Sequence, residues 1–200
     1  MGVKTFEDYY NRLLKMKPNV YIDGEKFDRS DPRLRPGINV IKESYDRAND
    51  PDFEDLCTAT SHITGEKINR NDDLLKKQMM TRVLCHRVGG CIQRCMGIDA
   101  MNALSVVTYE MDEAFGTDYY KRWEKFLRYF QENDITGNCA QTDCKGDRLK
   151  RPHEQVDPDL YLRVVETRKD GIIVRGAKIC NTVAPYADEI IALPTRFMTD

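Results

Sequence analysis

The amino-acid sequence predicts an α+β fold, with a helical N-terminal domain over residues 1–135 and a β domain over residues 136–200. Apolar residues recur at helical spacing through most of the first two-thirds of the chain. A polar segment rich in turn residues begins near residue 135, and short runs of β-branched residues follow it. The change from helical to β character is therefore expected within residues 133–140.

The N-terminal region is expected to contain short helices separated by turns, because segments with apolar residues at helical spacing alternate with proline and glycine. The predicted elements are a helix from Phe6 that ends before Pro18, a hairpin over residues 20–27 that turns at Asp23-Gly24, a loop marked by Pro32 and Pro36, a helix over residues 38–49 ended by Asp50-Pro51, and a short helix over residues 52–57.

The strongest helical pattern begins at Asn71, which offers an N-cap, and stops at Gly116. It predicts either one long helix or two helices joined at Gly89-Gly90, since a glycine pair in a helix interior costs about 2 kcal/mol relative to alanines. A further amphipathic helix is expected over residues 118–132, with its aromatic residues on one side.

The C-terminal region is expected to be a loop followed by strands. Residues 135–159 have loop composition. Two β-branched runs on either side of Lys169-Asp170-Gly171 predict an antiparallel hairpin, and EIIAL at residues 189–193 predicts a third short strand.

Composition excludes several classes of partner. The formal net charge of −2 provides no basic excess to neutralise phosphates, so nucleic acid is not expected. The longest apolar stretches are a few residues, against about 20 required to span a bilayer. The N-terminus has no apolar core of the secretory type. We therefore expect a cytoplasmic protein without membrane or nucleic-acid partners.

The chain contains seven cysteines, at positions 57, 85, 91, 95, 139, 144 and 180. An odd number of cysteines without a secretion signal does not predict a disulfide framework. Two interpretations stay open, and both can hold: some cysteines are buried core thiols, and some ligate a metal.

Cys91 and Cys95 lie four residues apart in CIQRC, which places both on nearly the same face of a helix. Two thiolates placed this way can hold two corners of a metal cluster. Arg94 between them either favours the thiolate form or is a solvated surface residue. A cubane iron–sulfur cluster takes four protein ligands, so the pair alone is also compatible with two core thiols. The three histidines have no ligand spacing to one another or to the cysteines, and we interpret His62, His86 and His153 as structural or surface residues.

Two polar segments are candidates for binding a ligand. QTDCKGDR, between the helical and β regions, has irregular backbone whose N–H groups can bind a phosphate or a polar ring edge, although its composition alone favours a solvated turn. CNT follows the second predicted strand, and its threonine can hydrogen-bond a ligand, although threonines at strand ends are usually structural. The candidate residues are Gln141, Thr142, Asp143, Cys144, Lys145, Gly146, Asp147, Arg148, Cys180, Asn181 and Thr182.

The order of several segments resembles a known family. VYIDGEK, RPGIN, CIQRCMGIDAMNAL, TYEMDEAFGTDYY, TDCKGDR and DPDLYLRVVETRKDGIIVRGAK occur here in sequence. They are similar to segments of the 4-hydroxybutyryl-CoA dehydratase/vinylacetyl-CoA isomerases, a branch of the 4-hydroxyphenylacetate 3-hydroxylase family. The family's hydroxylases lack the paired cysteines, so CIQRC favours the dehydratase branch.

The resemblance implies an acyl-CoA dehydrogenase-like fold: an N-terminal helical domain, a β-barrel-like middle domain and a C-terminal helical bundle. It implies FAD at the 141–148 loop and the 180–182 segment, and a [4Fe-4S] cluster with Cys91 and Cys95 as two of its ligands. The family's other two ligands, a His and a Cys, and its acid/base residues are expected beyond residue 200, as is the bundle. Cys144 departs from the family, whose loop more often has proline there.

The resemblance further implies a CoA-thioester substrate, dehydration of 4-hydroxybutyryl-CoA to crotonyl-CoA, vinylacetyl-CoA isomerisation and a homotetrameric assembly. We expect the 200-residue chain to be inactive without the missing C-terminal portion or a separate subunit that supplies it. Two alternatives stay open. One is an iron-free, flavin-dependent oxygenase component of the 4-hydroxyphenylacetate 3-hydroxylase type, and the other is a non-catalytic truncated or split-subunit product.

Overall fold

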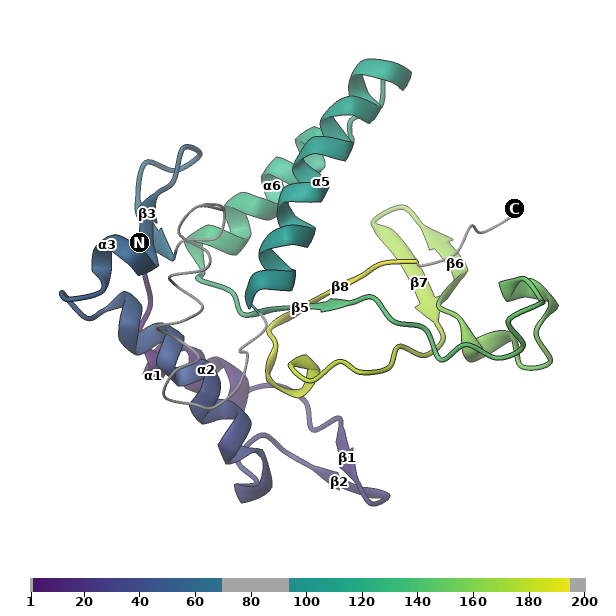
Figure 1. Ribbon diagram of the computed structural model, residues 1–200, viewed down its shortest axis with the longest axis horizontal. Helices are drawn as coiled ribbons and strands as arrows, with labels where there is room; N and C mark the ends of the chain where they lie inside the picture. The colour runs from purple at the N-terminus through teal and green to yellow at the C-terminus, as the bar shows by residue number, and fades with distance from the viewer. Residues whose placement is uncertain (1, 70–93, 195–200) are drawn as a thin grey trace. The chain divides into compact units, whose positions relative to one another are not determined.

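The computed structural model of the protein describes residues 2–69 and 94–194 (Figure 1). The chain forms two compact units. The first contains residues 1–137 and 185–189, and the second contains residues 138–184 and 190–200. The α-helices lie in the first unit and the longer strands in the second, so the predicted α+β class is confirmed.

The first unit contains five described α-helices and the 3₁₀ helix η1, and it shares the 3₁₀ helix η4 (Ala184–Tyr186) with the second unit. Their bounds are α1 Phe6–Leu14, η1 Pro32–Leu34, α2 Arg35–Ala48, α3 Glu54–Cys57, α5 Arg94–Phe115 and α6 Tyr119–Glu132. The expected start of the longest helix at Asn71 and the Gly89-Gly90 junction lie outside the described residues.

Helix α1 begins with a capping box. The Thr5 hydroxyl accepts a hydrogen bond from the Asp8 N–H, and the Asp8 carboxylate accepts one from the Thr5 N–H. The helix buries Phe6, Tyr9 and Leu13 on one face, which is the spacing that predicted it.

Helix α2 corrects one prediction. Pro36 does not mark a loop, because it lies in the first turn of the helix, where the missing N–H of proline costs no hydrogen bond. Two turns further on, Tyr45 is fully buried and stacks on Tyr9 of α1 with ring centroids 5.2 Å apart. This aromatic pair joins the two helices.

Two short hairpins flank these helices. Strands β1 (Val20–Ile22) and β2 (Glu25–Phe27) pair antiparallel as predicted, and Asp23 and Gly24 adopt the positive φ angles that a two-residue turn requires. Strands β3 (Thr58–Thr60) and β4 (Lys67–Asn69) form a second antiparallel pair that the sequence did not predict. A three-residue strand is too short for its alternation of apolar and polar residues to be detected in the sequence.

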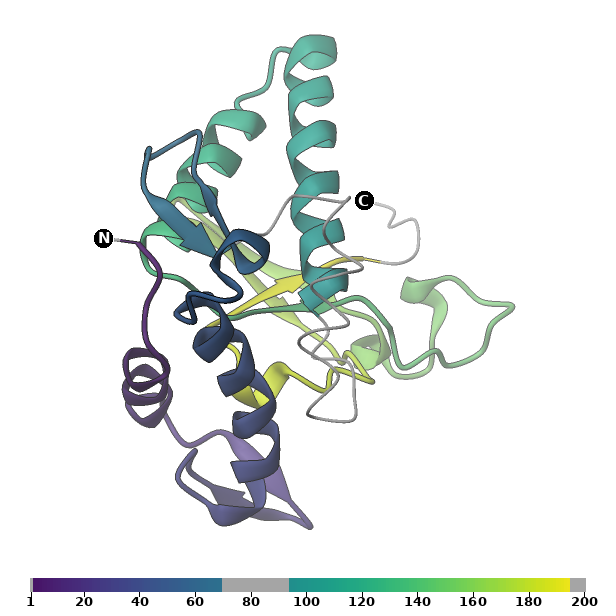
Figure 2. The ribbon, with the colours of Figure 1, turned by 60° about the vertical axis from the view of Figure 1, so that its left-hand side comes forward.

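Helices α5 and α6 lie side by side in both ribbon views (Figures 1 and 2). The rings of Tyr109 and Tyr120 meet edge to face at 5.6 Å between centroids. Asp112 near the end of α5 accepts hydrogen bonds from the N–H groups of Tyr119 and Tyr120, and therefore caps the N-terminus of α6.

The second unit contains the predicted hairpin. Strand β6 (Arg163–Arg168) pairs antiparallel with β7 (Gly171–Arg175), and the register shifts between Val164 and Glu166, as in a β-bulge. Three short 3₁₀ helices lie before and after the hairpin in the chain. They are η2 Pro152–Glu154, η3 Pro158–Leu160 and η4 Ala184–Tyr186.

Strand β5 (Gly137–Ala140) corrects the expectation that residues 135–159 form only loop. It pairs with β8 (Glu189–Ala192), which confirms the strand predicted at EIIAL. Asp188 N–H donates to Thr136 O and Leu193 N–H donates to Ala140 O, so the two strands run in the same direction.

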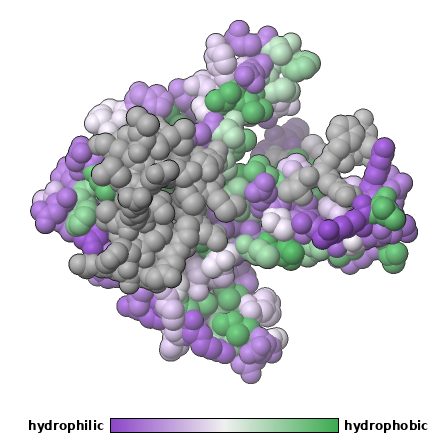
Figure 3. Space-filling view, in the orientation of Figure 1, coloured by the Kyte–Doolittle hydropathy of each residue, from purple (hydrophilic) through white to green (hydrophobic). Residues whose placement is uncertain are grey.

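Outside the grey atoms, the face drawn in Figure 3 mixes hydrophilic and hydrophobic residues. Within residues 2–69 and 94–194, no helix combines the length and apolar character needed to cross a membrane.

Candidate functional site

The structure places the start of the 141–148 loop beside residues 178–179, which precede the 180–182 segment. Ile179 N–H donates a hydrogen bond to Thr142 O at 2.9 Å, and Asp143 and Lys178 form an isolated antiparallel bridge. Both contacts lie in the second unit. The start of the 141–148 loop and the chain that leads into the 180–182 segment are therefore neighbours.

A buried ion pair accompanies this backbone pairing. Lys178 Nζ lies 2.5 Å from Asp143 Oδ1, and the two side chains are 8% and 3% exposed. The ammonium group also donates to Gln141 O at 3.0 Å and to Leu193 O at 2.6 Å. All three donors of the lysine are thus satisfied, as burial of a charged group requires.

Gln155, which is 8% exposed, supports the second half of the 141–148 loop through hydrogen bonds to Asp147. Its Oε1 accepts from Asp147 N–H at 2.9 Å and its Nε2 donates to Asp147 O at 2.8 Å. A Cβ on Gly146 would fall 2.3 Å from that Oε1, so a side chain at this position would require Gln155 to move. Lys145 adopts a positive φ of 54° immediately before it.

Several side chains of the two segments are available to a ligand. Gln141 and Thr182 are exposed and Thr142 is half-buried. Among residues 2–69 and 94–194, none of these three side chains has a hydrogen-bond partner. Hydroxyl and amide groups supply the donors and acceptors that a polar ring edge requires. Such groups can hydrogen-bond the polar edge of a flavin ring.

Asn138 and Cys139, in the strand that leads into the loop, add two further groups. Asn138 is 5% exposed, and its Nδ2 has no hydrogen-bond partner within the described part of the chain. Burial raises the pKa of the Cys139 thiol, against the opposing charge of Lys178. Cys139 is therefore a neutral thiol near pH 7, and it is not an activated nucleophile.

The proposed metal ligands lie largely outside the described residues. Cys91 is among residues 70–93, and Cys95 is described only as part of the α5 backbone. His86 also lies outside, whereas His62 and His153 are both exposed. In the part of the chain that the structure describes, no three His, Cys, Asp or Glu residues gather in a metal-binding arrangement.

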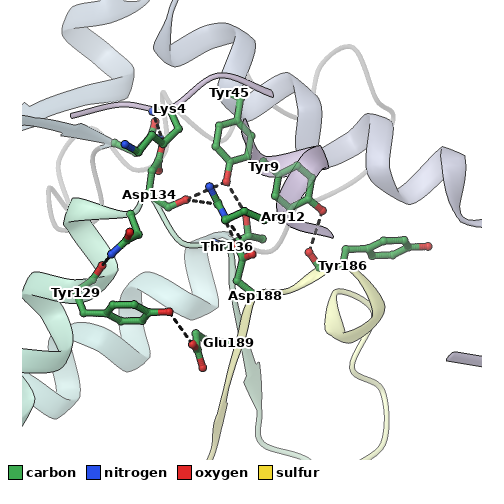
Figure 4. Close-up of polar contacts among 12 residues, drawn as sticks. Lys4, Tyr9, Arg12, Tyr45, Tyr129, Asp134, Thr136, Tyr186, Asp188 and Glu189 are labelled. Carbon is green, nitrogen blue, oxygen red and sulfur yellow. Dashed lines mark hydrogen bonds and ion pairs between the residues drawn. The ribbon is translucent and has the colours of Figure 1, made fainter. Parts of the chain in front are cut away.

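A second polar cluster was not predicted. It lies in the first unit and joins α1, α2, the turn after α6 and residues 186–189 (Figure 4). Its labelled members are Lys4, Tyr9, Arg12, Tyr45, Tyr129, Asp134, Thr136, Tyr186, Asp188 and Glu189. Most of its contacts join residues far apart in the chain, and no local sequence pattern reports such pairings.

The contacts of this cluster are those of a structural network. Tyr9 hydroxyl donates to Tyr186 O at 2.9 Å, and burial raises the pKa of Tyr9 far above its usual range. Asp134 Oδ2 accepts from Lys4 N–H at 2.9 Å, and both Asp134 oxygens accept from the Asn69 amide. These buried groups satisfy one another, as polar groups in a core must.

Comparisons with known proteins place the chain in a family. The family model described as 4-hydroxyphenylacetate 3-hydroxylase N terminal matches residues 5–200. The 4-hydroxybutyryl-CoA dehydratase/vinylacetyl-CoA-Δ-isomerase of Clostridium aminobutyricum is 44% identical over 98% of this chain and 42% of its own length. The 4-hydroxyphenylacetate 3-monooxygenase oxygenase component of Geobacillus sp. (strain PA-9) is 28% identical over 98% of this chain and 41% of its own length.

Solved structures agree. An oxygen-tolerant archaeal 4-hydroxybutyryl-CoA dehydratase from N. maritimus is 40% identical, with a TM-score of 0.91 over 98% of this chain and 41% of that chain. The oxygenase component HpaB of 4-hydroxyphenylacetate 3-monooxygenase, complexed with FAD, has a TM-score of 0.70 at 20% identity over 96% of this chain and 41% of that chain, which shows the same fold.

The chain spans about two-fifths of the length of these relatives. The resemblance to the N-terminal portion of the dehydratases is confirmed by the identity of 44%. Because the family model matches almost every residue, the chain belongs to the 4-hydroxyphenylacetate 3-hydroxylase N-terminal family.

Proposed function

We propose that this chain is the N-terminal part of a flavin- and [4Fe-4S]-dependent enzyme that dehydrates 4-hydroxybutyryl-CoA to crotonyl-CoA and isomerises vinylacetyl-CoA. The observation that carries the proposal is the 44% identity to a dehydratase/isomerase along almost the whole chain, against 28% to an oxygenase component. The substrate is accordingly a CoA thioester.

FAD is the proposed ligand of the 141–148 loop and the 180–182 segment. Two observations support this assignment: the two segments start from one backbone pairing, and the Gln141, Thr142 and Thr182 side chains are available to hydrogen-bond a ligand. The HpaB structure of the same fold is complexed with FAD.

Cys91 and Cys95 are the proposed ligands of two cluster corners. Their spacing of four residues places them on one face if the helix of α5 continues back to Cys91. A cubane cluster takes four protein ligands, so two more, a His and a Cys by the family's pattern, must come from elsewhere in the enzyme.

When bound, the flavin supplies reversible one-electron chemistry that acidifies the C3 proton, and the cluster supplies a Lewis acid for the departing hydroxyl. The Thr182 hydroxyl would hydrogen-bond the flavin ring and tune its electronic properties, and the 141–148 loop would position the flavin. Cys91 and Cys95 anchor the cluster through their thiolates. The general base lies outside this set of residues.

The wider architecture is part of the same proposal. Residues 1–135 form the N-terminal helical domain and residues 136–200 the first part of a β-barrel-like middle domain in an acyl-CoA dehydrogenase-like fold. A C-terminal helical bundle, in the same or a separate polypeptide, completes the active site of a cytoplasmic homotetramer. The 200-residue chain alone is accordingly inactive.

Metal and flavin analysis of the native holoprotein, purified without oxygen, tests the proposal. We expect iron and acid-labile sulfide in equal amounts, one FAD per subunit, and conversion of 4-hydroxybutyryl-CoA to crotonyl-CoA. Cys91→Ser and Cys95→Ser should each lose most of the iron but retain FAD. Cys57→Ala is the matched control, because Cys57 lies in the core of the first unit, and it should retain both cofactors.

An iron-free oxygenase component is the second candidate, favoured by the similarity to the Geobacillus protein. It predicts FAD binding or use of reduced flavin without iron, and hydroxylation of a phenol. Holoprotein that carries flavin, lacks iron and leaves 4-hydroxybutyryl-CoA unchanged would establish this alternative.

A further inference from the structure

We propose that Lys178 is a positioning residue that fixes the two flavin-binding segments against each other, with Asp143 as its buried counter-charge. The proposal rests on the proposed function for the identity of the ligand. The geometry on which it depends is independent of that ligand.

Lys178 joins three parts of the second unit through one atom. Its Nζ donates to Gln141 O, which follows β5, and to Leu193 O, which follows β8. Its third contact is the Asp143 carboxylate within the 141–148 loop. Because β5 and β8 run in the same direction, the ammonium group caps the carbonyl ends of both strands.

The pairing beside Lys178 determines where the 180–182 segment lies. Ile179 is the last residue bonded to the loop, through Thr142 O, and Cys180 then adopts a positive φ of 58° that turns the chain. A slip of one residue in this pairing would move the 180–182 segment by about 3.3 Å along the strand direction. A displacement of that size would break any hydrogen bond from the 180–182 segment to a bound ligand.

The ion pair resists such a slip because both partners are buried. Removal of one partner leaves the other charge buried and uncompensated, whereas removal of both charges costs far less. Arginine cannot replace the lysine, because its planar fork does not fit three acceptors arranged around one nitrogen. The pair therefore specifies one register of the loop against the segment.

The test uses three variants: Lys178→Met, Asp143→Asn and the double variant that carries both substitutions. Arg168→Met is the control. Each variant is measured in the native holoprotein and in its flavin-depleted form. Arg168 pairs with Glu166 in the same unit, but both side chains are more than half exposed, so Arg168→Met controls for loss of an ion pair. The measurements are amide hydrogen exchange at Ile179, the FAD dissociation constant by equilibrium dialysis, and the visible spectrum of the bound flavin.

We expect Lys178→Met to accelerate Ile179 exchange at least tenfold, to weaken FAD binding at least tenfold and to shift the flavin spectrum. The double variant should recover at least part of each effect, and Arg168→Met should match the wild type. Exchange and affinity within twofold of the wild type in Lys178→Met would overturn the proposal, as would unchanged FAD affinity with faster exchange. If wild-type protein binds no FAD, the proposed function fails, while faster Ile179 exchange still supports the role of Lys178 in holding the segments together.

Discussion

Arg12 and Asp188 form a two-pronged ion pair although 176 residues separate them in the chain (Figure 4). Arg12 Nε lies 3.2 Å from Asp188 Oδ1, and Arg12 Nη2 lies 3.1 Å from Asp188 Oδ2. Arg12 also donates to Asp134 O at 3.1 Å, and Asp188 accepts from Thr136 N–H at 2.9 Å. Helix α1 is thereby attached to both chain segments that lead into the β5–β8 pair.

Arg12→Met should destabilise the first unit by about 2 kcal/mol, because it leaves Asp188 buried without its charged partner. The Asp188 side chain is 7% exposed and that of Arg12 29%, so solvent screens the pair only in part. Chemical denaturation measures the change in the free energy of unfolding.

Arg122→Met is the control for this prediction. Arg122 pairs with Asp118, but these side chains are 64% and 67% exposed, and the expected cost is about 0.5 kcal/mol or less. Equal costs for the two variants would contradict the structural role of Arg12.

Tyr45→Phe should cost about 1 kcal/mol, because it removes a buried hydroxyl and retains the ring that stacks on Tyr9. The hydroxyl donates to Asp134 O at 3.1 Å and lies 2.8 Å from Thr136 Oγ1. Tyr21→Phe at a 64% exposed position should leave the unfolding free energy unchanged. A neutral result for Tyr45→Phe in denaturation experiments would show that the hydroxyl adds nothing to the network.

Local patterns in the sequence were sufficient to predict those helices and strands that have a clear apolar spacing or distinctive turn residues. The apolar spacing of α1 and the turn residues of the β1–β2 and β6–β7 hairpins predicted these elements correctly. Pro36 was misread because proline is compatible with both a loop and a first helical turn. Strand β5 was missed because its four residues lie in a polar segment and are stabilised by β8, about 50 residues later.

The candidate site could be predicted only in part for the same reason. The composition of the 141–148 loop alone favoured a solvated turn, and the resemblance to the family made it a flavin-binding candidate. Neither could show that the loop pairs with residues 178–179. Lys178 was overlooked because lysine is almost never fully buried unless it is paired. Its partner Asp143 lies 35 residues away in the chain, and a single sequence contains no signal for such a pairing.

Asp112→Asn should destabilise α6 near neutral pH and progressively less in acid. Burial alone would raise the pKa of Asp112, but hydrogen bonds from Thr117, Tyr120 and Tyr119 outweigh it, and the pKa lies below its usual value. A lowered pKa in the folded state contributes stability that is fully present above the unfolded value of about 3.9 and is lost as the pH falls through the folded value.

The measurement is the difference in Tm between the wild type and Asp112→Asn at pH 7 and at pH 3. The difference should shrink at the lower pH, whereas for the exposed neighbour Glu113 a Glu113→Gln variant should show little difference at either pH. A Tm difference for Asp112→Asn that is the same at both pH values would show that the charge of Asp112 does not support the cap.

Gly146→Ala should destabilise the second unit by about 1–3 kcal/mol, because the added methyl group overpacks the loop. The new Cβ would lie 2.3 Å from Gln155 Oε1 and 2.7 Å from Leu160 Cδ1. Gln155 would have to move, and its hydrogen bonds to the backbone of Asp147 would lengthen. The 141–148 loop would then lose the support that fixes its shape, so FAD retention should fall together with stability.

Gly171→Ala separates this effect from the general loss of a glycine. Nothing lies within 4 Å of a Cβ at Gly171 and its φ is not positive, so the expected change is within about 0.5 kcal/mol. Thermal denaturation and the ratio of flavin to protein absorbance report both quantities for each variant. If Gly146→Ala retains wild-type stability but loses FAD, the methyl group obstructs the ligand directly and Gln155 is not the support of the loop. If it retains both, the loop tolerates a side chain at position 146, and the close approach to Gln155 does not constrain it.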